Sequence, residues 1–189
     1  MLKRVAVALL IALLLASAAV PAAAQTYVCE NLCTFDYPDD WEDFGADSSN
    51  DEEGEYYNLA FIGGSAYDDL NVSVDLYYYD VYADIRLFSA DEATLRDYVR
   101  DIESSFYEVA SSEVVEVGEY GIPFAILRGT DRDGEALYAE TLANGWCIAF
   151  YGYAYGRNGR EMRELTDEDE RIFREIIASF EPILKESGA

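Results

Sequence analysis

The chain has 189 residues, with 38 Asp or Glu, 13 Lys or Arg and no histidine, so its formal charge at pH 7 is −25. A charge this negative repels nucleic-acid phosphates and anionic lipid head groups, so neither is expected as a partner. The lack of histidine excludes Ser-His-Asp and Cys-His catalytic arrangements and the histidine ligands of most catalytic zinc sites. No cofactor is expected.

The first 24 residues have the pattern of a secretory signal peptide. Lys3 and Arg4 precede an apolar run from Val5 to Val20, which ends in small residues up to Ala24. This order is typical of a cleaved signal, although the run is about long enough to be an uncleaved membrane anchor. We expect cleavage near Ala24, which leaves a secreted or otherwise extracytoplasmic chain without a membrane span. The loss of Lys3 and Arg4 then changes the formal charge from −25 to −27.

Two short strands, Tyr27–Cys29 and Cys33–Tyr37, are predicted next, joined by three residues. A hairpin with that loop length would set Cys29 opposite Cys33, within reach of a disulfide. In an oxidising compartment the three cysteines should give one disulfide and one thiol, and we favour Cys29–Cys33, with Cys147 buried as a small apolar residue. The sequence alone leaves the other pairings open, and a metal site of three thiolates is a further alternative.

The segment Asp43–Glu55 is acidic and is predicted to be a solvated loop. Its part Asp47–Gly54, and the later stretch Asp131–Glu135, carry clustered carboxylates that invite a calcium interpretation. Neither has its glycine at the offset of an EF-hand loop, and a turn alone explains Asp133-Gly134. We therefore expect no defined metal site, and leave open whether 47–54 binds divalent cations weakly.

Strands are then predicted over Tyr57–Ile62 and over Leu70–Tyr79, where alternation is regular. A capping box at Ser89–Glu92 predicts an amphipathic helix with its apolar positions at Leu95, Val99, Ile102 and Phe106. Four strands are predicted to follow as an antiparallel meander, with Asn144-Gly145 as a tight turn; they are Val114–Val117, Pro123–Arg128, Leu137–Leu142 and Trp146–Tyr153.

A second amphipathic helix is predicted after Thr166, with its apolar stripe ending at Phe180 and Pro182 just beyond. Strands, a helix, a meander and a final helix indicate an α+β fold. Residues 25–184 are expected to form a single domain of ordinary size, followed by a frayed tail at 185–189.

Two segments resemble the PsbP-like superfamily. Tyr27–Trp41 is similar to its opening, where a short hairpin runs into an aromatic-x-Tyr-Pro-x-x-Trp strand, here from Phe35 to Trp41. Ile176–Phe180 resembles the helix that commonly ends such domains in a Ser-Phe pair. The resemblance implies an α-β-α sandwich, an antiparallel sheet of about six to seven strands covered by two main helices.

That superfamily includes an extrinsic subunit of the photosynthetic oxygen-evolving complex, a nuclear-import factor and many exported bacterial proteins. Its members mostly bind proteins rather than catalyse, so the resemblance implies an accessory role. It assigns no functional residue, because the matching positions are packing positions. Cys33 departs from the pattern, since a glycine is common there.

Tyrosine is unusually frequent, with 16 residues. Tyr77 and Tyr79 share one face of their predicted strand, and Tyr151 and Tyr153 share one face of theirs. We take these four tyrosines and Asp75 as candidate ligand-binding residues, because an exposed surface of this kind suits a sugar, a basic peptide or another protein. The alternative is that a helix covers the rings as core.

The favoured hypothesis is an exported, non-enzymatic binding or accessory protein that acts through contacts with a protein partner. One alternative is a binder of calcium or a glycan that uses the tyrosine and carboxylate surface. Another is a carboxylate-dependent hydrolase, which would require two acids about 5–10 Å apart in a cleft.

Overall fold

The structure is a computed structural model that describes residues 24–29, 33–43, 50–51, 54–63, 70–78, 99–100, 102–143, 146–156 and 161–183. The expected signal peptide up to residue 23, most of the acidic segment 44–53 and the tail beyond 183 lie outside these ranges. Within them, no helix has both the length and the apolarity that a membrane crossing needs.

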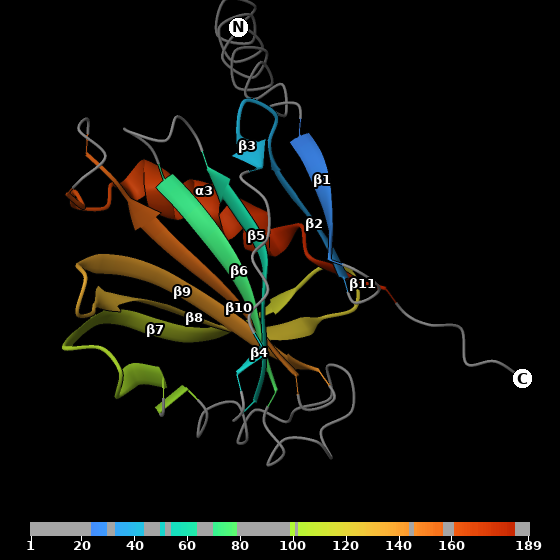
Figure 1. Cartoon of the computed structure of the whole chain (residues 1–189), viewed down its shortest axis with the longest axis horizontal. Coiled ribbons are helices and arrows are strands. Elements are labelled where there is room, and N and C mark those ends of the chain that lie inside the picture. Colours follow the sequence, from blue (N-terminus) through green and yellow to red (C-terminus); the bar gives the residue numbers. More distant parts are fainter. Residues whose placement is uncertain are drawn as a thin grey trace, which may run out of the picture.

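A large antiparallel sheet of eight strands forms the body of the molecule (Figure 1). Its strand order is β3-β5-β6-β10-β9-β8-β7, and β4 pairs with β5 outside this path. The strands are β3 (Glu42–Asp43), β4 (Asn50–Asp51), β5 (Gly54–Gly63), β6 (Leu70–Tyr78), β7 (Glu108–Val117), β8 (Ile122–Thr130), β9 (Glu135–Ala143) and β10 (Trp146–Ala154).

A second, smaller sheet and one helix lie against one face of the large sheet (Figure 1). The small sheet has the order β1-β2-β11, with β1 (Ala24–Cys29), β2 (Cys33–Pro38) and β11 (Glu181–Pro182). The helix is α3 (Asp167–Ala178). The Ser179 hydroxyl at its end accepts a hydrogen bond of 2.7 Å from the backbone N–H of Asp36 in β2. Helix and small sheet therefore form a joint layer.

The expected α-β-α sandwich with two main helices over a sheet of about six to seven strands is wrong. The described chain is mostly β, its strands divide into two sheets, and α3 is the one long helix in it. The reason is that the N-terminal hairpin pairs with the residues after α3 instead of joining the large sheet. Of the helix predicted at mid-chain, residues 99–100 and 102–106 are described; Val99–Arg100 and Ile102–Glu103 are helical, but the helix has ended before Phe106.

The predicted meander is confirmed, because β7, β8, β9 and β10 pair antiparallel in sequence order. Its strands are longer than the sequence suggested, most of all β7, which begins six residues before Val114. The hairpin register is confirmed as well, since Cys29 lies opposite Cys33. The alternation in β6 also holds, with Val72, Val74 and Leu76 buried on one face.

The main core lies between the large sheet and the layer made by α3 and the small sheet. Its largest members are five fully buried phenylalanines, and their rings meet mostly edge to face; they are Phe35, Phe124, Phe150, Phe173 and Phe180. Gly152 allows α3 to approach, because a Cβ there would lie 2.9 Å from the Phe173 ring. At this point of β10 the Phe173 ring therefore fills the space that a side chain of the strand would take.

The start of α3 is fixed by polar contacts. The Thr166 hydroxyl accepts from the backbone N–H of Asp169, and the Asp169 carboxylate accepts in return from the N–H of Thr166, which makes a capping box. Arg163 adds a bidentate ion pair to the same carboxylate, at 2.6 and 2.9 Å. Burial alone would raise the pKa of Asp169, but the hydrogen bonds from Arg163 and Thr166 hold it below its usual value.

Candidate functional site

A row of aromatic rings crosses the other face of the large sheet. Tyr138 of β9 and Tyr151 of β10 are opposite each other, with ring centroids 4.5 Å apart. Tyr151 stacks on Tyr153 at 5.6 Å, and Phe106 meets Tyr138 edge to face at 6.4 Å. Ile102 packs beside them, so the row is a second, small hydrophobic cluster. Tyr151 and Tyr153 remain only partly buried, at the end of the row.

Two buried carboxylic acids lie next to this row. Asp75 of β6 and Glu140 of β9 are both in register with Ala149 of β10, one on each side of it. The Tyr138 hydroxyl donates a hydrogen bond to Glu140. Neighbouring strands are about 4.8 Å apart, so the backbones of β6 and β9 are separated by about 10 Å, with β10 between them.

Burial changes the acidity of this cluster. Glu140 is 2% exposed, and burial raises the pKa of its carboxyl to about 8. The pKa of the Cys147 thiol is also raised, first by burial and then by the charge of Glu140. Burial, with a smaller effect of the Asp131 charge, raises the pKa of Tyr151 to about 12. A reactive thiolate at Cys147 is therefore disfavoured near neutral pH.

Tyr153 connects the aromatic row to the turn between β8 and β9. Its hydroxyl donates a hydrogen bond of 2.8 Å to Asp131, and burial followed by this bond raises the pKa of Tyr153. The other carboxylate oxygen of Asp131 accepts from the N–H groups of Asp133 and Gly134, which closes the turn. Gly134 has a φ of 146° and lies under Met162, where a Cβ would be 3.1 Å from the sulfur.

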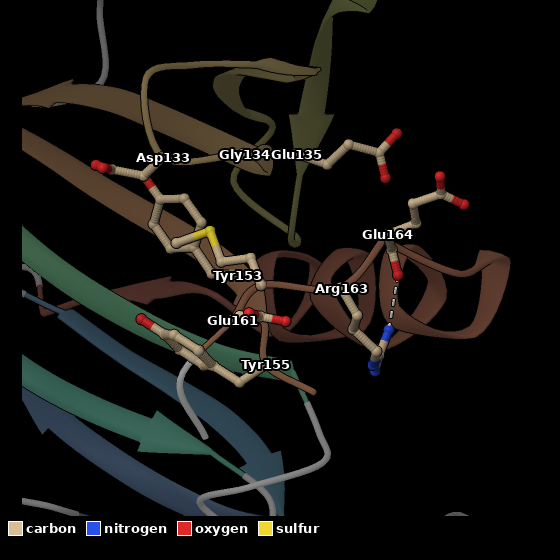
Figure 2. A pocket seen from close by; sticks show the side chains of 9 residues that line it. Asp133, Gly134, Glu135, Tyr153, Tyr155, Glu161, Arg163 and Glu164 are labelled. Carbon is tan, nitrogen blue, oxygen red and sulfur yellow. Dashed lines mark hydrogen bonds between the residues drawn. The ribbon is translucent and has the colours of Figure 1, made fainter. Parts of the chain in front are cut away.

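An open groove of about 730 Å³ lies beyond this turn. Figure 2 shows the side chains of Tyr153 and Tyr155 on one side of it and those of Glu135, Arg163 and Glu164 on the other. Tyr155 pairs with Met162 in an isolated antiparallel bridge, which holds the segment 161–164 beside the end of β10. The groove is lined by Asp133, Gly134, Glu135, Tyr153, Tyr155, Glu161, Met162, Arg163 and Glu164.

Some of the charged side chains that line the groove have partners among the described residues, and others do not. The Arg163 guanidinium is neutralised by Asp169, and Glu135 accepts from the N–H of Leu165 at 2.7 Å. Asp133, Glu161 and Glu164 are exposed to solvent. Neither Glu161 nor Glu164 pairs with a basic side chain within the described part of the chain. The arrangement therefore offers carboxylates and two phenol rings to a ligand, which suits a cation or a ring-stacking group.

The candidate tyrosines predicted from sequence are brought together only in part. Tyr151 and Tyr153 lie side by side as expected, and Asp75 is on the same face, buried. Tyr77 is in register with Cys147, at the end of β6 that is far from the groove; its side chain and all of Tyr79 lie outside the described residues.

Cys29 and Cys33 are opposite each other and buried, and both are free thiols in the structure. A hydrogen bond with Cys29, together with burial, raises the pKa of the Cys33 thiol. Among the described residues, no three His, Cys, Asp or Glu side chains are grouped as metal ligands would be. Most of the acidic stretch 47–54 lies outside them.

Sequence reasoning missed several residues of this region, among them Tyr138, Glu140, Tyr155, Met162 and the groove carboxylates Glu161 and Glu164. Glu140 lies two positions after Tyr138 in the predicted strand Leu137–Leu142, and this spacing was a signal that the acid and the ring share one face. Tyr155 and Met162 flank a polar connection without periodicity, so nothing in the sequence indicated that they pair.

No protein-family model matches the sequence, and no curated protein matches it. Among solved structures, the chain is similar to the solution structure of cyanobacterial PsbP (CyanoP) from Synechocystis sp. PCC 6803. The identity is 15%, the TM-score is 0.48, and the match covers 88% of this chain and 96% of that one. A likeness of this degree assigns neither an activity nor a residue role to the chain.

Proposed function

We propose that this chain is an extracytoplasmic accessory protein, without catalytic activity, that binds a partner protein through the groove at Tyr153 and Tyr155. The groove takes a lysine or arginine side chain of that partner. The observation that supports this proposal is the lining of the groove. Two tyrosine rings share it with Glu161 and Glu164, which have no basic partner among the described residues, whereas Glu135 pairs with Arg128 and Asp133 with Arg132.

Charge supports a cationic ligand. With 38 acidic and 13 basic residues, the chain attracts basic partners at long range and repels acidic ones. Within the groove, a cation held over a tyrosine face at an exposed site gains about 0.5–1 kcal/mol. Each carboxylate on the rim adds a contact of similar size, which is weakened by salt. A single side chain would thus bind weakly, and affinity would come from the rest of the partner surface.

The test uses the mature chain and two small probes, the tripeptide Gly-Lys-Gly and its neutral analogue Gly-Gln-Gly. Calorimetry or tyrosine fluorescence should show weak binding of the lysine peptide, on the order of millimolar, and none of the neutral one. Tyr155→Leu should weaken binding about two- to fivefold, because it removes the ring face. Glu161→Gln with Glu164→Gln should weaken it further.

A matched control is Glu168→Gln with Glu175→Gln. It removes the same charge from the exposed face of α3, where both carboxylates pair with Arg171. Binding that responds equally to both pairs of substitutions would reflect net charge alone and would contradict the proposal.

The alternative ligand classes are distinguished by the same assay. The glycan interpretation would be favoured if a neutral oligosaccharide binds the parent chain, if Tyr155→Leu weakens that binding, and if Gly-Lys-Gly does not bind. A rise in melting temperature with calcium that Glu161→Gln abolishes would favour a cation binder.

A further inference from the structure

The strand β7 lies at the outer edge of the large sheet, beside β8 (Figure 1). Among the described strands, β8 is its sole pairing partner, with registers from Glu108–Thr130 to Val117–Ile122. A strand at an edge presents backbone N–H and C=O groups that another extended chain can pair with.

The edge is long and exposed. β7 has ten residues, and most of its side chains between Glu108 and Glu116 are exposed or half-buried. Tyr107 and Tyr120, just before and just after the strand, are 78% and 56% exposed. A bulge at Ala110 breaks the register near one end, and the pairing is regular from Ser111 to Val117. Aromatic residues at both ends of a free edge are suited to anchor a partner.

The charge of this edge selects the partner. The stretch 108–120 has four glutamates and no basic residue. Glu113 pairs with Arg174 of α3 at 2.7 Å, whereas Glu108 and Glu116 are exposed. Two copies of this chain joined at β7 would bring these glutamates together, which disfavours self-association. An added strand with lysine or arginine side chains is favoured instead.

We propose that the outer edge of β7, which pairs with no described strand, binds an extended, basic segment of a partner protein as an added β-strand. The segment forms backbone hydrogen bonds along Ser111–Val117, and its basic side chains lie beside Glu116, on the face of β7 opposite to Glu113. This contact is independent of the groove, although β7 begins beside the β8–β9 turn that forms one wall of the groove.

The test uses two synthetic peptides of nine residues that carry the same charge. One alternates lysine and valine, and in the other each valine is replaced by proline, which cannot donate a backbone hydrogen bond to a ladder. The valine peptide should bind the mature chain about tenfold more tightly than the proline peptide. Hydrogen exchange of the segment 108–117 should slow by about tenfold in its presence.

Glu116→Lys should weaken binding of the valine peptide about fivefold, since it reverses a charge beside the added strand. Glu42→Lys is the matched control, because Glu42 is an exposed residue of β3 at the opposite edge of the sheet; it should have little effect. Equal affinity for both peptides, unchanged exchange of β7, or a dimer of the chain that protects β7 without peptide would each overturn the proposal.

Discussion

The Tyr153 hydroxyl and the Asp131 carboxylate are joined by a hydrogen bond of 2.8 Å, across 22 positions in the sequence. Through this bond the end of β10 holds the β8–β9 turn in place, and the turn in turn supplies Asp133, Gly134 and Glu135 to the groove. One phenol–carboxylate contact thus links the two parts of the meander that line the candidate site.

Tyr153→Phe should lower the free energy of unfolding by about 1 kcal/mol, because it removes this partly buried hydrogen bond and keeps the ring. Denaturant unfolding measures the change. Tyr155→Phe is the control, since no hydrogen bond of its hydroxyl to a described residue is found, and it should cost less than about 0.5 kcal/mol. Equal losses in the two variants would contradict the role given to the Tyr153–Asp131 bond.

Ionisation of Glu140 should lower the stability of the protein as the pH rises from about 5 to 8. Its pKa in the folded chain is about 8, above the ordinary 4.5, so the native state binds the proton more tightly than the unfolded state. The stability that protonated Glu140 contributes is present in full below its pKa in the unfolded chain. It is lost as the pH rises from that pKa to the folded-state pKa of about 8, by up to about 1.4 kcal/mol per pH unit.

Glu140→Gln isolates this effect, because it keeps the shape of the side chain and removes the titration. The melting temperature of the variant should fall less than that of the parent over the same pH range. A parent and a variant with parallel pH profiles would show that Glu140 does not titrate there.

Gly152→Ala should destabilise the fold by about 1–3 kcal/mol, because its Cβ would lie 2.9 Å from the Phe173 ring and force α3 outward. Phe173→Leu on its own is expected to cost about 1 kcal/mol or more through lost packing. If the clash is the cause, the double variant will be more stable than the sum of the two losses predicts. Strict additivity would argue against this contact.

Cys29 and Cys33 should form a disulfide when the purified mature chain is exposed to an oxidised glutathione buffer. The antiparallel register already sets them opposite each other, and the short loop limits the stabilisation to about 2 kcal/mol. Peptide mapping without reduction should find this bridge and a free Cys147 thiol. A bridge that includes Cys147, or three thiols after oxidation, would contradict the pairing.

The parts of the fold that were predictable are those with a strong local pattern. Regular alternation identified β6 and the meander, and the polar residues of Asp131–Gly134 located the turn between β8 and β9. The turn predicted at Asn144-Gly145 lies outside the described residues. The capping box at Thr166 located α3. In each case the signal is contained in a few neighbouring residues, so no knowledge of distant contacts was needed.

The division into two sheets was not predictable in this way. It depends on Glu181 and Pro182 pairing with Thr34 and Cys33, and a strand of two residues that contains a proline has no periodicity to detect. The candidate site was also hard to predict, because it depends on contacts between residues far apart in the sequence. Tyr153 was found from its strand, but its neighbour Tyr138 follows from the register between β9 and β10, which alternation alone does not give.

The most direct test of the groove is an NMR titration of the isotope-labelled mature chain with Gly-Lys-Gly at low salt. We predict that the resonances of residues 133–135, 153–155 and 161–164 shift together with one dissociation constant, and that added salt reverses the shifts. Shifts confined to other surfaces, or no shift in these three segments at saturating peptide, would contradict the assignment of this groove as the binding site.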